Sequence, residues 1–307
     1  MRHIFDQAVP SVKNAFAASP SLLAIRTRKP FSTDVPMESL RHFPLGTPFP
    51  PSPHAVASSL PTLADVRGYE EKDPRVMAAL QSGYPRFLQH RFVRELASLY
   101  LERLGLDRRF AVLVPGRRTV QDMLDRLGPG FACERVETQL FLVHCDADDS
   151  SRAEALRKYV QHVGCGLSSR EAEDWLVRYG RLEGRHPEPP FEGHAESGAL
   201  QDLAGVIGCR PADLLLCASG MNAFFAAFRA IQEFQQSRGR TRWLQLGWLY
   251  LDSGVILREF LDDGEQLDYC YAADDAEAVL AAIASLGSDL AGVVVECPTN
   301  PLAQVAD

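Results

Sequence analysis

Val293-Val-Val-Glu-Cys-Pro-Thr-Asn-Pro-Leu302 is the stretch that decides the fold. Its apolar start belongs to a predicted buried strand over residues 291–297. An acid and an asparagine bracket the proline turn at the end of that strand. Upstream, further short apolar stretches alternate with helical patterns. Strands are predicted at 214–217, 243–247 and 266–271, and helices at 220–236, 252–261 and 275–286. Non-alternating strands separated by helices predict a parallel sheet covered on both faces.

The chain before this sheet has a different character. Residues 1–60 are rich in proline and poorly periodic, which predicts an extended arm. Residues 61–190 are predicted to form a mixed α/β region, and 200–307 the first part of a larger domain. Within the mixed region we expect a helical stretch over 74–104 and strands at 110–114 and 139–144. Capping boxes at Ser151 with Glu154 and at Ser168 with Glu171 predict two helix starts, and 181–190 is a linker by composition.

Composition excludes several classes of protein. The chain has 307 residues, of which 46% are hydrophobic and 23% charged, as in an ordinary globular protein. A net charge of −8 disfavours a nucleic-acid-binding surface. No apolar run approaches the roughly 18 residues of a membrane span, and Asp6 stands where a signal peptide needs apolar residues. The seven cysteines form no CxxC pair, so we expect reduced thiols, no metal site and a cytoplasmic location.

Three sets of candidate residues follow predicted strands. Ser219-Gly220-Met221 lies between a strand and a long helix, where free N–H groups can hold an anion. Tyr250 follows the next strand, and Glu296 and Asn300 bracket the proline turn at the end of the last. Because parallel strands end at the same edge of a sheet, these residues are expected to lie together. Each set also has an ordinary structural explanation as a turn or as a side chain covering the sheet edge.

Taken together, these motifs resemble the Cys/Met-metabolism family of pyridoxal-phosphate enzymes. Ser-Gly-Met before a helix, Tyr-x-Asp-Ser, and Glu-x-Pro-Thr-Asn-Pro-Leu-x-x-Val-x-Asp carry the likeness. Four upstream stretches, 54–62, 68–71, 83–87 and 161–170, resemble the long-N-terminus form of cystathionine γ-synthase. The resemblance therefore covers about residues 54–307. It implies the aspartate-aminotransferase-like (fold type I) large domain, here incomplete and preceded by the mixed α/β region.

The resemblance also implies roles for individual residues. Gly220 and Met221, with Ser219 beside them, would bind the phosphate of pyridoxal 5′-phosphate. Tyr250 would stack on the cofactor ring and assist proton transfers, and Asn300 would bond the 3′-oxygen. A family Tyr-x-Arg pair clamps the phosphate from a neighbouring subunit of a homo-oligomer. Its arginine corresponds to Arg170, where Ser168 then replaces the tyrosine, or to Arg86 in Tyr84-Pro85-Arg86, and we favour Arg170.

The implied activity is a γ-replacement in transsulfuration and methionine biosynthesis, in which cysteine displaces the acyl group of an O-acyl-homoserine. The alternatives are a homoserine-ester sulfhydrylase, a γ-lyase, or a catalytically inactive homologue. In the family, a Schiff-base lysine and an aspartate on the pyridinium nitrogen follow the last motif. The lysines here are Lys13, Lys29, Lys72 and Lys158. The sequence therefore predicts a chain truncated before its catalytic lysine and inactive by itself.

Overall fold

The computed structural model describes residues 43–81, 83, 89–189, 191–299 and 302–305. Asn300, the Tyr84-Pro85-Arg86 alternative and most of the proline-rich arm lie outside the described residues. The chain divides into two units, residues 1–43 and residues 44–307, and the elements below belong to the second.

The first elements of this unit are small. Strands β1 (Pro48–Phe49) and β2 (Ala57–Ser58) pair antiparallel. Helix α2 (Leu63–Glu70) and helix α3 (Pro74–Ala79) follow. Helix α4 (Arg91–Leu104) is a separate helix, since the backbone turns extended at Leu80 (φ −67°, ψ 115°) and ends α3. The expected helical stretch over 74–104 is therefore interrupted.

An antiparallel sheet forms the centre of the mixed α/β region, in the order β3 (Arg109–Pro115), β5 (Leu140–Asp146), β4 (Ala132–Arg135). The strands at 110–114 and 139–144 are thus confirmed, whereas the short, mostly exposed β4 had no apolar signal. Helices α5 (Arg117–Leu127) and α6 (Ser150–Val163) follow β3 and β5. The cap of α6 is Asp149 rather than Ser151, because the Asp149 carboxylate accepts from the Arg152 N–H. The Ser168 cap of α7 (Ser169–Arg178) is confirmed.

This sheet is covered on both faces. Leu113 and Leu142 on one face pack against α4 and α7. Val114 and Val143 on the other pack against α5 and α6. All four side chains are at most 1% exposed, and full burial of such a side chain contributes about 1.5–3 kcal/mol. Both faces of this sheet are therefore buried in apolar cores.

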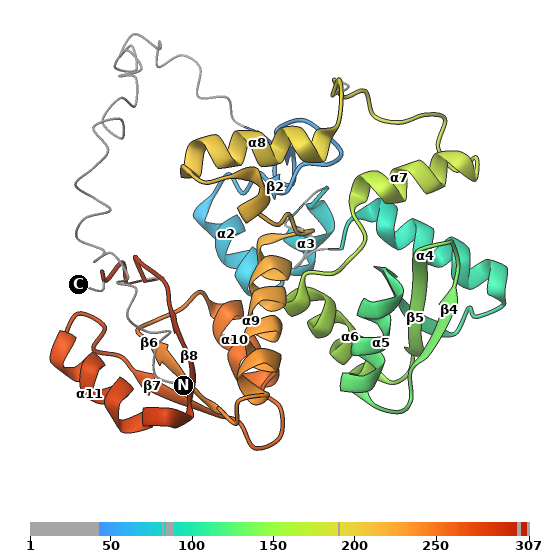
Figure 1. Cartoon of the computed structure of the whole chain (residues 1–307). Helices are drawn as coiled ribbons and strands as arrows, with labels where there is room; N and C mark the ends of the chain where they lie inside the picture. Colours follow the sequence, from blue (N-terminus) through green and yellow to red (C-terminus); the bar gives the residue numbers. More distant parts are fainter. Residues whose placement is uncertain (1–42, 82, 84–88, 190, 300–301, 306–307) are drawn as a thin grey trace, which may run out of the picture. The chain divides into compact units, whose positions relative to one another are not determined.

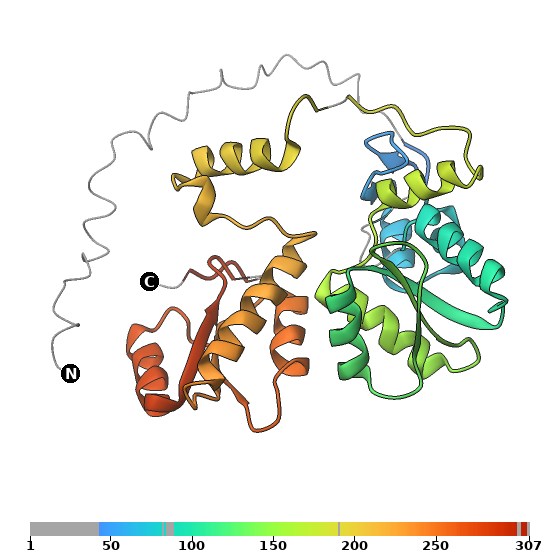
Figure 2. The same cartoon turned by 45° about the vertical axis from the view of Figure 1, so that its right-hand side comes forward.

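A parallel sheet forms the last part of the chain, with β6 (Arg242–Leu246) between β7 (Gln266–Cys270) and β8 (Leu290–Val295). Helix α11 (Ala276–Leu286) covers the face that carries Leu244 and Leu246. Helices α9 (Gly220–Gln236) and α10 (Leu251–Glu259) lie side by side on the other face, where Trp243 is buried against Phe228 (Figures 1 and 2). The predicted parallel sheet with helices on both faces is confirmed.

The strand expected at 214–217 is wrong. These residues follow helix α8 (Ala195–Ile207) and a short 3₁₀ turn, and they pair with no described strand. Leu215 is 84% exposed, so the apolar run that suggested burial lies at the surface. Among the described residues, no helix is both long and apolar enough to cross a membrane.

Helix α6 belongs to the cores of both regions. Its buried side chains contact β3 and β5 on one side and join the cluster of α9, α10 and Trp243 on the other. One direct contact is between the rings of Tyr159 and Phe260, whose centroids are 5.8 Å apart. The two sheets are therefore linked through one continuous apolar cluster.

Candidate functional site

The three parallel strands end close together. At Gly247, directly after β6, an added Cβ would lie 3.0 Å from Thr299 Cγ2, after β8, and 3.1 Å from Ala273 Cβ, after β7. The positive φ of Gly247 (62°) also favours glycine at this turn. The carboxyl edge of the sheet, where ligands of open parallel sheets bind, is therefore closely packed behind the first residues of α10.

Tyr250 and Glu296 meet at this edge, as the sequence predicts. The Tyr250 backbone N–H donates to Glu296 Oε2 at 2.7 Å, and the tyrosine side chain is half-buried. Tyr250 is the N-cap of α10, so the Glu296 carboxylate also lies at the positive end of that helix. Glu296 thus holds the backbone of Tyr250 at the start of α10.

The start of α9 offers free backbone donors. The Ser219 hydroxyl caps the helix by accepting from the Asn222 N–H at 3.1 Å, and it donates to the Gly164 carbonyl at 3.2 Å. Within the described part of the chain, the N–H groups of Gly220 and Met221 have no acceptor. Gly220 is exposed, and a Cβ there would meet nothing within 4 Å. The two N–H groups therefore lie without an intrahelical acceptor at the positive end of a 17-residue helix, Gly220 at the surface and Met221 with its side chain in the core.

The last turn of α6 touches both helix starts. At the α9 start, Asn222 Nδ2 donates to the Val163 carbonyl at 3.2 Å, next to the Ser219–Gly164 bond. At the α10 start, Gln161 Nε2 lies 3.3 Å and His162 Nδ1 3.2 Å from Asp252 Oδ1. These residues were not singled out as site residues from the sequence. Their only signal was the upstream stretch 161–170 of the resemblance.

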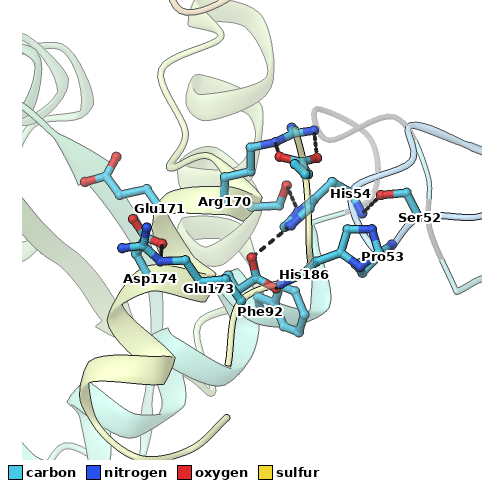
Figure 3. Close-up of polar contacts among 12 residues, drawn as sticks. Ser52, Pro53, His54, Phe92, Arg170, Glu171, Glu173, Asp174 and His186 are labelled. Carbon is cyan, nitrogen blue, oxygen red and sulfur yellow. Dashed lines mark hydrogen bonds and ion pairs between the residues drawn. The ribbon is translucent and has the colours of Figure 1, made fainter. Parts of the chain in front are cut away.

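Arg170 does not contact the starts of α9 and α10 in this chain. It lies in the first turn of α7, and its guanidinium binds the Glu188 carboxylate through two hydrogen bonds of 2.7 and 2.6 Å (Figure 3). The pairing raises the pKa of Arg170 and lowers that of Glu188. Its assignment to a phosphate on a neighbouring subunit stays a prediction, and the Arg86 alternative lies outside the described residues.

The same view shows a second polar cluster. His54 Nε2 lies 3.1 Å from Glu173 Oε2, and His54 Nδ1 lies 3.0 Å from Ser169 Oγ (Figure 3). The other Glu173 oxygen accepts from the His186 N–H at 3.0 Å. Both ring nitrogens of His54 and both carboxylate oxygens of Glu173 have partners inside the protein, which indicates a structural role.

The donor set fits part of pyridoxal phosphate. Two open N–H groups at a helix start suit a phosphate, and the half-buried Tyr250 ring beside the sheet edge suits the face of a pyridine ring. No lysine follows Lys158, which is exposed on α6 one turn before His162. The described residues could therefore hold the phosphate and one ring face, without supplying a buried lysine.

A cavity of about 520 Å³ lies elsewhere, at the opposite edge of the sheet. Three acids, Asp262, Asp263 and Glu265, contribute to its lining. Carboxylates repel a phosphate, and the site described above is at the carboxyl edge, so this cavity is not the candidate site. Among the described residues, no cluster of His, Cys, Asp and Glu is arranged to hold a metal.

Comparison with known proteins agrees with the motifs. The chain is 34% identical over 265 residues to the L-2-amino-4-chloropent-4-enoate dechlorinase/desaturase of Streptantibioticus cattleyicolor, a match that covers 85% of this chain and 52% of that protein. It is 30% identical over 162 residues to a cystathionine γ-synthase-like enzyme of Amanita muscaria, covering 43% of this chain and 26% of that enzyme. Over 158 residues it is 28% identical to the cystathionine γ-synthase of Neurospora crassa, covering 43% and 25%.

The chain is thus homologous to cystathionine γ-synthase-like proteins and to an amino-acid dechlorinase. It spans about half the length of the dechlorinase and smaller shares of the other relatives. No family model matches the chain. No solved structure matches it significantly, so the mixed α/β architecture is the level of fold that is established.

Proposed function

We propose that the starts of α9 and α10 form the phosphate and ring subsites of a pyridoxal-phosphate enzyme of the Cys/Met-metabolism family, with a fold type I large domain. The observation that carries this proposal is that one turn of α6 contacts both helix starts, through Ser219 beside the Gly220 and Met221 N–H groups and through Asp252, two residues after Tyr250. Homology to cystathionine γ-synthase-like proteins supports it.

The residues of this chain would act by binding and orientation. Gly220 and Met221 would donate to the phosphate, and the helix dipole of α9 would favour its negative charge. Tyr250 would lie against the ring and move a proton through its hydroxyl. When bound, pyridoxal phosphate supplies an electron sink for the bond changes at the substrate α-carbon. Asn300 remains the proposed partner of the 3′-oxygen.

The proposed substrate class is an L-amino acid with a leaving group on its γ-carbon. An O-acyl-homoserine carries an acyloxy group there, and cysteine would displace it to give cystathionine. The name of the Streptantibioticus relative places chlorine on the same carbon of a pentenoate amino acid. A γ-elimination with loss of halide is therefore the second candidate, because that relative matches 85% of this chain. A shared-site homo-oligomer and a cytoplasmic location belong to the same proposal.

The test compares pyridoxal 5′-phosphate with pyridoxal, by calorimetric titration of the 307-residue chain. A phosphate held by two charge-assisted hydrogen bonds should make the phosphorylated ligand bind at least tenfold more tightly. Turnover is not the readout, since no lysine follows Lys158. Equal affinity for the two ligands would show that α9 does not hold the phosphate, and binding of neither would overturn the proposal.

A further inference from the structure

The last turn of α6, Gln161–Gly164, connects the two subsites. Its residues 163 and 164 offer carbonyls to Asn222 and Ser219 at the start of α9, and residues 161 and 162 contact Asp252 in the first turn of α10. At Gly164 an added Cβ would lie 2.3 Å from Ser219 Oγ and 3.2 Å from Met221 Cβ. The turn is therefore in van der Waals contact with the residues proposed to bind phosphate.

Asp252 is the acceptor on which the α10 side of this arrangement depends. The residue is 2% exposed, and a carboxylate withdrawn from water needs partners nearby. Gln161 Nε2 donates to Oδ1 at 3.3 Å, and His162 Nδ1 lies 3.2 Å from the same oxygen as a close polar contact. The His162 side chain is itself only 13% exposed.

Asp252 and Tyr250 belong to the same first turn of α10, so a displacement of one displaces the other. Tyr250 is the N-cap of α10 and stands two residues before Asp252, and its carbonyl accepts from the Gly254 N–H at 3.1 Å. One helical turn thus contains both the carboxylate that His162 contacts and the ring proposed to stack on the ligand. A shift of this turn would move Tyr250 relative to the α9 start.

We infer that His162, acting on Asp252, is a positioning residue that sets the distance between the ring subsite at Tyr250 and the phosphate subsite at the start of α9. The inference rests on the proposed function, and it gives a role to α6. A ligand that occupies both subsites gains affinity when they are correctly spaced, because its second contact forms at a high effective concentration once the first is made. A ligand that occupies one subsite does not depend on the spacing.

The test measures two ligands on two matched variants of the full chain. In H162N the amide takes the place of ring Nδ1 and can still reach Asp252, whereas in H162A that contact is lost. We expect H162A to bind pyridoxal 5′-phosphate at least tenfold more weakly than the unsubstituted chain, and H162N to bind within about threefold of it. Inorganic phosphate, which needs only the α9 start, should bind all three proteins equally.

Other results would overturn the inference. Equal loss of phosphate and pyridoxal-phosphate affinity in H162A would mean that His162 acts on the α9 start and not on the spacing of the subsites, and no loss would mean that it positions neither. Hydrogen exchange gives a readout that needs no cofactor: in H162A the Gly254 amide should exchange at least tenfold faster, with the second turn of α10 unchanged. If the unsubstituted chain binds no pyridoxal phosphate, the proposed function fails, while the exchange result still decides whether His162 positions this turn.

Discussion

Two polar clusters of this chain show how a closed arrangement differs from an open one. Around His54, in the mixed α/β region, both carboxylate oxygens of the buried Glu173 and both ring nitrogens have partners within the protein (Figure 3). Around the starts of α9 and α10, the side chains of Ser219 and Asp252 are bonded, while the Gly220 and Met221 N–H groups have no acceptor within the described residues. The first cluster holds the chain together, and the second has capacity left for a ligand.

The two sheets differ in the same sense. The antiparallel sheet is covered on both faces, and the side chains of Leu113, Val114, Leu142 and Val143 are at most 1% exposed. At the edge strand of the parallel sheet, Val293 and Val295 are 39% and 43% exposed. Strand β8 is therefore less covered than β3 and β5, and the candidate chemistry lies where the parallel strands end.

The largest effect is expected in the closed cluster. Glu173→Ala leaves His54 buried without its carboxylate and the His186 N–H without an acceptor, so it should lower the free energy of unfolding by about 3–5 kcal/mol. The matched control is Glu171→Ala, an exposed residue in the first turn of the same helix, where loss of a carboxylate at the positive helix end should cost at most about 1 kcal/mol. Urea denaturation measures both; similar losses would mean that the His54 cluster is not a structural one.

A smaller effect is expected where α6 meets α9. Gly164 and Gly105 both end helices with positive φ, 66° and 65°, so alanine is strained at either position by about 1 kcal/mol. At Gly105 the new Cβ meets nothing within 4 Å, whereas at Gly164 it lies 2.3 Å from Ser219 Oγ. Gly164→Ala should therefore cost about 2–4 kcal/mol and Gly105→Ala only the strain. Equal free energies of unfolding for the two variants, measured by denaturation, would contradict the close contact between α6 and α9.

Much of this arrangement could be predicted from the sequence because the signals were local. Short strand-like stretches separated by helical patterns identified β6, β7 and β8, and parallel pairing then required Tyr250 and Glu296 to share an edge. Residues 214–217 have the same apolar signal, yet Leu215 is exposed. An apolar run does not specify its pairing partner, so periodicity alone could not reveal this difference.

The role of α6 could not be predicted for a different reason. Its contacts with Ser219 and Asp252 join residues 55 to 91 positions apart in the chain. No spacing rule relates Gln161 and His162 to a helix start that far away, and the packing of Tyr159 against Phe260 is equally non-local. Contacts of this kind follow from tertiary structure, which a single sequence does not display.

The most direct test of the central claim, that the start of α9 binds a phosphate through backbone N–H groups, is the pyridoxal 5′-phosphate affinity of Gly220→Pro against Gly220→Ala. Proline is tolerated at the first position of a helix and removes one N–H group, and Ser219 before it is already extended (φ −157°, ψ 167°). Alanine keeps the N–H at a position with open space. The account predicts that G220A binds as the unsubstituted chain does and that G220P binds about tenfold or more weakly. Equal binding by the two variants would contradict it.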